Sequence, residues 1–334
     1  MAGITGKDAL LTDYANKLEK LDPPKGRSLT QDAVRRLVRN KAAVASVFIV
    51  LFIVLFAFVG PYFLPWTYDK IDWSGIRKPP NFEAGHFAGT DQNGRDMLAR
   101  IMQGTQMSLI VAGVATLVSV IIGVIYGAVA GYLGGKVDAV MMRFVDIMYA
   151  LPYILFVIIL VVIFGRNPVL LFVGIGCLEW LTMARIVRGQ TLSIKEREFI
   201  EAAKAGGAKP WTIIMRHIVP NLTGPVVIYA TLTIPEIILT ESFLSYLGLG
   251  VQEPQTSLGT LISFGSPVAE TLPWMLIGPA VVLVSLLLVQ SVAVLAVLEL
   301  VARAKIGVDG GAGLGSGRVH HPAAVPSRDG PRAG

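Results

Sequence analysis

Two acidic residues interrupt stretches that are otherwise apolar, and their carboxyl groups are the side chains of this sequence best placed to do chemistry. They are Glu179 and Glu236, the second of which directly follows Pro235. A charge at the centre of a bilayer costs about 3 kcal/mol, so both groups should face a bundle interior or an interface. There they would line a polar path and balance an ammonium group of a transported molecule. The alternative for Glu179, six residues before Arg185, is a place near the cytoplasmic surface in contact with water. Glu236 is the stronger candidate, because a proline frees a backbone carbonyl and marks a bend.

No other group of residues forms a catalytic or metal-binding motif. The segment GYLGGK at 131–136 is one residue shorter than a phosphate-binding loop, and Val137 follows it where that loop has Ser or Thr. The serines and histidines form no nucleophile motif. One cysteine, Cys177, and four dispersed histidines exclude a disulfide framework and leave no cluster of metal ligands. We therefore expect no enzymatic activity, no metal and no cofactor in this chain.

The composition indicates what holds these residues in place. Of the 334 residues, 53% are hydrophobic and 16% are charged, against about 25% charged in an ordinary soluble domain. The mean hydropathy of +0.62 exceeds what a soluble core of this size requires. In a soluble protein the net charge of +6 would suggest nucleic acid as a partner. Here the positive residues lie between apolar segments, so we expect a lipid bilayer and no nucleic acid.

Six apolar segments are long enough to cross a bilayer, which requires about 20 residues. We place them at 43–63, 108–133, 145–165, 168–186, 223–249 and 273–301. The predicted fold class is therefore all-α integral membrane with six spans. The first segment follows a 41-residue polar leader, which is too long for a cleaved secretory signal.

The positions of Lys and Arg predict the orientation, because positively charged loops stay in the cytoplasm. Nine lie in 1–41, two in 134–146, seven in 185–216 and five in 303–334, which makes 23 on one side against six on the other. We therefore expect both termini in the cytoplasm.

Small residues recur at every fourth position of the second span. Gly123, Gly127, Gly131 and Gly135 continue a register that begins with Ala115 and Ser119. In lipid, such a stripe lets two helix backbones approach closely. We predict tight packing inside the chain; the alternatives are a face that lines a substrate path and a contact between two copies.

The longest inner loop, 192–221, is amphipathic rather than merely polar. Its sequence is LSIKEREFIEAAKAGGAKPWTIIMRHIVPN. Gly206 and Gly207 should end a first short helix, and Pro210 is well suited to the first turn of a second, where its missing N–H costs nothing. The loop thus predicts two short helices joined at a glycine elbow. A hairpin that rests on lipid headgroups would share this pattern.

Within this loop, Glu201-Ala202-Ala203, then Gly207, then Ile218-Val219-Pro220 resembles the EAA loop of permease subunits of ABC importers. Other segments are similar to the C-type permease subunit of oligopeptide and dipeptide importers, and the leader is most similar to the oligopeptide type. These segments are GTDQNGRDMLARI (89–101), GYLGGKVDAVMMRFVDI (131–147), MARIVRGQTLSIKEREFIEAAKAGG (183–207), RHIVPN (216–221) and ESFLSYLGLGVQEP (241–254). The resemblance covers roughly residues 26–290.

The resemblance implies the six-span fold of a type I ABC importer permease, half of a translocation path for oligopeptides or dipeptides. The loop would sit in a cleft of a cytoplasmic ATPase and move as a rigid lever when the ATPase dimer closes on ATP. The residues assigned to this coupling are Glu201, Ala202, Ala203, Gly207, Ile218 and Pro220.

The implied partners are a second, B-type permease subunit, two cytoplasmic ATPase subunits that bind ATP and Mg²⁺, and an extracytoplasmic peptide-binding protein. The implied location is the bacterial cytoplasmic (inner) membrane. The alternative is a proton-driven secondary transporter of peptides, in which Glu179 and Glu236 titrate; it predicts inverted repeats that the sequence does not display.

We expect four parts in the chain. They are a cytoplasmic leader (1–41), the first transmembrane helix with its outer loop (42–104), a core permease domain (105–302) that carries the coupling loop 192–221, and a disordered cytoplasmic tail (303–334). Two departures from the family accompany this division. Ser257-Leu258-Gly259 replaces the usual Ser-Trp-Gly, and the chain from about residue 290 lacks the usual ending.

Overall fold

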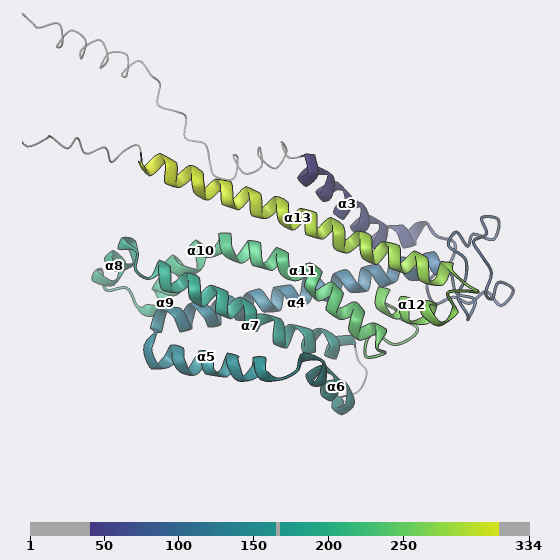
Figure 1. Ribbon diagram of the computed structural model, residues 1–334, viewed down its shortest axis with the longest axis horizontal. Helices are drawn as coiled ribbons and strands as arrows, with labels where there is room; N and C mark the ends of the chain where they lie inside the picture. The colour runs from purple at the N-terminus through teal and green to yellow at the C-terminus, as the bar shows by residue number, and fades with distance from the viewer. Residues whose placement is uncertain (1–40, 165–167, 314–334) are drawn as a thin grey trace, which may run out of the picture.

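The structure, a computed structural model, describes residues 41–164 and 168–313. The leader 1–41, apart from Lys41, and the tail from residue 314 lie outside the described residues. Long helices run side by side along one axis, with the short helices α8 and α9 at one end and α12 at the other (Figure 1). The helices are α3 (Lys41–Phe58), α4 (Met97–Leu133), α5 (Gly135–Ala150), α6 (Tyr153–Phe164), α7 (Pro168–Ile194), α8 (Glu198–Ala205), α9 (Pro210–Ile213), α10 (Val219–Asn221), α11 (Thr223–Tyr246), α12 (Leu258–Gly265) and α13 (Trp274–Gly313).

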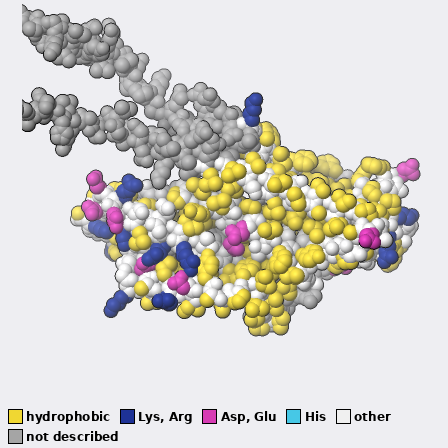
Figure 2. Space-filling view, in the orientation of Figure 1, with side chains coloured by type: hydrophobic (Ala, Val, Ile, Leu, Met, Phe, Trp, Pro, Cys, Tyr) yellow, Lys and Arg dark blue, Asp and Glu magenta, His cyan; other side chains and the backbone are white. Residues whose placement is uncertain are grey.

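Helices lie within all six segments predicted to span the bilayer, and the third segment holds the end of α5 and the whole of α6. By length and composition, three helices of the described ranges can cross a membrane on their own: α4, α11 and the part Trp274–Leu295 of α13. The bent pair α5 and α6 makes a fourth if it is counted as one span. Hydrophobic side chains cover the middle of the visible surface, while charged side chains gather toward its two ends (Figure 2). The arrangement is that of an all-α membrane protein.

The third predicted span, 145–165, is not one helix. The chain bends by 80° between α5 and α6. Leu151 at the bend is extended, with φ −74° and ψ 126°, because Pro152 disfavours a helical conformation in the residue before it and lacks the N–H that a helix requires. The third predicted span is therefore bent. Below, "the elbow" means Leu151 and Pro152 between α5 and α6, as distinct from the glycine elbow of the loop.

Two helix ends also differ from the prediction. Helix α4 begins at Met97 rather than at residue 108. The side chain of Asp96 is its N-cap and accepts a hydrogen bond from the backbone N–H of Ala99 at 2.7 Å. Its first turns carry Arg100, which is buried and paired with Asp91, so a charged residue lies inside the helix. Helix α13 continues to Gly313, eleven residues into the segment predicted to be a disordered tail.

The glycine stripe of α4 packs against α7, as predicted. A Cβ atom on Gly127 would lie 2.4 Å from the carbonyl oxygen of Ala184, and one on Gly123 would lie 2.6 Å from the Cβ of Met183. Both distances are far below van der Waals contact, so only glycine permits this approach. Gly135 takes no part, since it begins α5 with a positive φ.

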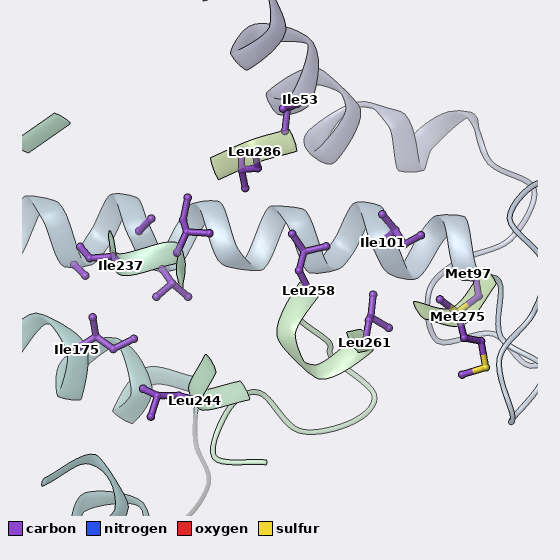
Figure 3. Packing of buried hydrophobic residues seen from close by; sticks show 14 of the residues in the cluster. Ile53, Met97, Ile101, Ile175, Ile237, Leu244, Leu258, Leu261, Met275 and Leu286 are labelled. Carbon is purple, nitrogen blue, oxygen red and sulfur yellow. The ribbon is translucent and has the colours of Figure 1, made fainter. Parts of the chain in front are cut away.

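The largest buried cluster lies between α4, α11, α12 and α13 (Figure 3). Its members include Ile101, Ile237, Leu244, Leu258 and Leu286. Helix α3 lies at the edge of the bundle, where it packs on α13 and α4. This cluster fixes α11 relative to α4.

Candidate functional site

The loop 192–221 contains the two predicted short helices and the predicted glycine elbow. Helix α8 ends at Ala205, and Gly207 follows with φ +74°, a conformation that glycine adopts without strain. Pro210 occupies the first turn of α9. A turn of π-helix, Ile214–Ile218, then leads into α10 and α11.

The loop is anchored by a cluster of buried isoleucines. Ile200 of α8 is fully buried and belongs to one cluster with Ile213 and Ile218. The same cluster includes Met183 of α7 and Ala128 of α4. Because α8 follows α7 in the chain and α10 precedes α11, the loop is fixed to the ends of the long helices rather than free in solvent.

The predicted coupling residues divide into an exposed set and a buried one. Glu201, Ala202, Gly207 and Pro220 are exposed, and Ala203 is half-buried. Ile218 is fully buried in the cluster. Its side chain therefore packs inside the loop and does not present a surface to a partner.

Three large apolar residues of this loop are exposed, and none of them was among the predicted coupling residues. Phe199 on α8 is 42% exposed, Trp211 on α9 is 56% exposed, and Met215 is 40% exposed. Large apolar groups exposed among charged ones mark interaction surfaces. Their signal in the sequence was the presence of large apolar side chains in a loop rich in Lys and Glu.

Glu179 and Glu236 meet in one cavity. The cavity has a volume of about 420 Å³, and its walls are the elbow between α5 and α6, one side of α7 and one side of α11. Glu179 comes from α7 and Glu236 from α11. The remaining polar lining consists of Tyr149, Tyr153, Thr182 and Thr240.

The backbone of Glu179 lies far from the end of α4 that leads into α5. Its backbone carbonyl accepts the hydroxyl of Ser119 at 3.0 Å, and Ser119 lies 14 residues before Leu133 at the end of α4. At about 1.5 Å per residue, that is roughly 21 Å from the helix end. Glu179 is thus half-buried well away from that end of α4, in the same cavity as Glu236.

The cavity is acidic. Both charged residues among its described lining residues, Glu179 and Glu236, are acidic, and the buried hydroxyl of Tyr153 has no hydrogen-bond partner in the described part of the chain. No Lys, Arg or His is among the described lining residues. The guanidinium of Arg185 lies 4.1 Å from the ring centre of Tyr149, but it is paired with Asp146 at 2.8 Å. The geometry suits a cationic group and disfavours an anionic one.

A third buried carboxyl, Glu241, was not singled out from the sequence. It is fully buried in α11 and accepts the hydroxyls of Ser108 at 2.8 Å and Ser245 at 2.7 Å. Ser108 belongs to α4, so this group ties α4 to α11. The spacing of Glu241 and Ser245, one helical turn apart, was the available signal.

Comparisons with known proteins agree with this architecture. The family described as "Binding-protein-dependent transport system inner membrane component" matches residues 119–306, and "N-terminal TM domain of oligopeptide transport permease C" matches residues 28–80. The chain is 53% identical over 270 residues to the oligopeptide transport system permease protein OppC of Escherichia coli K12, covering 81% of this chain and 88% of that protein. It is 42% identical to the dipeptide transport system permease protein DppC of Bacillus subtilis, over 74% of this chain and 77% of that one.

One solved structure shares the fold. A chain of the inward-facing MetNI methionine ABC transporter superposes with a TM-score of 0.51 and 20% identity. The match covers 62% of this chain and 97% of that chain.

Proposed function

The chain belongs to the family of binding-protein-dependent transport system inner membrane components, and from this premise we propose that it forms half of the translocation path of an ATP-driven importer of oligopeptides or dipeptides. It is a multi-pass permease subunit of an ABC importer in the inner membrane, and it works with other components of that importer. It is not an enzyme, because ATP hydrolysis belongs to separate subunits. Nothing in the comparisons favours a proton-driven transporter.

The anchored loop is the observation that carries this function. Glu201, Ala202, Gly207 and Pro220 are exposed on a segment that Ile218 and its neighbours hold against the long helices. The small Ala202 allows a partner to approach closely, with the half-buried Ala203 beneath it, and Glu201 can pair with a cation of that partner. A force applied to this surface would reach the long helices without first deforming the loop.

The partners of this proposal are a second, B-type permease subunit, two cytoplasmic ATPase subunits that bind ATP and Mg²⁺, and an extracytoplasmic peptide-binding protein. The ATPase would receive Phe199 and Trp211 in a cleft, because these exposed apolar groups lose contact with water on docking. The distribution of Lys and Arg supports a cytoplasmic position for this loop and for both termini.

The translocation path of this proposal runs past Glu236 and Glu179. Glu236 is exposed in the middle of α11, a helix hydrophobic enough to cross a membrane. A carboxylate that faced lipid there would be costly, so the side that carries it should face the second permease subunit and the path. The ammonium group of a peptide can be balanced between the two carboxylates during passage.

Reconstitution of the complete transporter tests the function. Vesicles that contain this chain, its permease partner, the ATPases and the binding protein should accumulate labelled peptide when ATP is supplied on the ATPase side. Vesicles without the ATPases should accumulate none, with or without a pH gradient. Uptake driven by the gradient alone would refute the assignment to ATP-driven import.

A further inference from the structure

Helix α5 is bound to α7 at successive levels along its length. The guanidinium of Arg188 on α7 donates two parallel hydrogen bonds to the carboxylate of Asp138 on α5, from Nε to Oδ1 and from Nη2 to Oδ2, both at 2.6 Å. Arg185 binds Asp146 at 2.8 Å. Near the elbow, the hydroxyl of Tyr149 is hydrogen-bonded to that of Thr182.

These polar contacts matter for the position of α5 because few of its side chains are buried. Of the 16 residues of α5, all of which are described, only Asp138 and Val145 are buried. Val145 packs against Leu178 and Leu181, which also belong to α7. One hydrogen bond, from the hydroxyl of Tyr126 to the carbonyl of Met141 at 2.9 Å, joins α5 to α4. Helix α5 thus contacts both α4 and α7, and its side-chain ion pairs are formed with α7.

Helix α7 reaches from the loop to the cavity. It ends at Ile194, four residues before α8 begins at Glu198. Nearer the beginning of the same helix, Glu179 and Thr182 line the cavity. The elbow that follows α5 lines the cavity from another side. The remaining wall is α11, which continues from the other end of the loop.

The strength of the two ion pairs differs. The side chains of Arg188 and Asp138 are 35% and 13% exposed, against 45% and 52% for Arg185 and Asp146. A two-bond guanidinium–carboxylate pair fixes orientation as well as distance, and the less exposed pair is less screened by water and salt. Arg188 and Asp138 are therefore the principal connection.

We propose that the Arg188–Asp138 pair, assisted by Arg185–Asp146, is a positioning device that makes α5 follow α7, so that displacement of the loop moves the elbow and Glu179 together relative to Glu236. The inference rests on the proposed coupling function of the loop. Without the pair, α7 would carry Glu179 but leave the elbow behind, and the cavity would change shape only in part when ATP binds.

Asp138→Asn tests this device in the complete reconstituted transporter, because it removes the charge and keeps the shape. We expect co-purification of all subunits and peptide-stimulated ATP hydrolysis within twofold of wild type. Peptide transported per ATP should fall by about tenfold, equivalent to about 1.4 kcal/mol of coupling. The exchange variant Asp138→Arg with Arg188→Asp should recover most of this ratio, because it restores opposite charges at the same two positions.

A distance measurement separates positioning from general stability. Spin labels at positions 151, at the elbow, and 239, on α11, should report a change of distance on ATP binding in the wild-type complex. That change should be reduced in Asp138→Asn and restored in the exchange variant. Lys136→Gln, which alters an exposed charge on the first turn of α5, is the matched control and should behave as wild type.

The outcomes distinguish this inference from the proposed function. If wild-type vesicles show no ATP-dependent uptake, the proposed function fails. If they do, and Asp138→Asn keeps the wild-type ratio of peptide to ATP, the positioning role is refuted. The positioning role is also refuted if the exchange variant assembles but recovers neither the ratio nor the distance change. This second test still applies if Asp138→Asn alone fails to assemble.

Discussion

Two neighbouring residues of α8 should give opposite phenotypes when each is replaced by alanine. Ile200 is fully buried in the cluster beneath the loop, whereas Phe199 is 42% exposed. Ile200→Ala removes three carbon atoms from the core, worth about 2.4 kcal/mol at about 0.8 kcal/mol each, and an unfilled cavity raises the cost toward 5 kcal/mol. Phe199 is not a member of that cluster, so Phe199→Ala should lower the stability of the loop by less than Ile200→Ala does.

Amide hydrogen exchange of residues 198–205 measures the difference directly. A loss of about 2.4 kcal/mol from local stability makes exchange through local opening roughly 50-fold faster. We expect this acceleration for Ile200→Ala and smaller ones for Ile200→Val and Phe199→Ala. ATPase co-purification should show the reverse order of effects, with Phe199→Ala losing the partner from an intact loop.

The reasoning would be refuted by exchange rates in the opposite order. If Phe199→Ala accelerates exchange in the isolated permease and Ile200→Ala does not, the buried and docking faces of α8 have been assigned the wrong way round. A wild-type exchange pattern in both variants would show that the cluster does not hold the loop.

Three other outcomes are expected. Gly207→Val should abolish ATP-driven uptake but leave membrane insertion intact, because valine is strained at φ +74°; uptake and immunoblots of the membrane fraction test this. Glu236→Gln and Glu179→Gln should each reduce uptake of a peptide with a free ammonium group more than that of its N-acetylated form, since both carboxylates line one cavity; equal losses for the two peptides would contradict this. A cysteine at position 209 should resist an impermeant thiol reagent in sealed cells and react after lysis, and labelling in intact cells would overturn the orientation.

Features set by local spacing were predictable from the sequence. The glycine stripe predicted close packing because only the recurrence of small residues on one helix face matters, and Gly127 against Ala184 shows that approach. The glycine elbow and Pro210 predicted the two loop helices because glycine and proline act on the backbone next to them. The elbow at Pro152 was visible as a proline, but the apolar run around it masked the bend.

Sites built from residues that are far apart in the sequence were not predictable. Glu179 and Glu236 are 57 positions apart in sequence, and nothing local indicates that they line the same cavity. The distance of six residues between Glu179 and Arg185 does not reveal that the backbone of Glu179 contacts Ser119 of α4. The partners of Glu241 and Asp138 likewise include residues of other helices.

The peripheral position of α3 sets this helix apart from the rest of the bundle. Helix α3 packs on α13 and α4 at the edge of the bundle, and Phe48 and Phe52 on it are each 66% exposed. It also belongs to a region matched by its own sequence family, 28–80, separate from the family that matches 119–306. Helix α3 is thus an anchor at the edge of the bundle that exposes aromatic side chains, and it lies in a segment with a sequence family of its own.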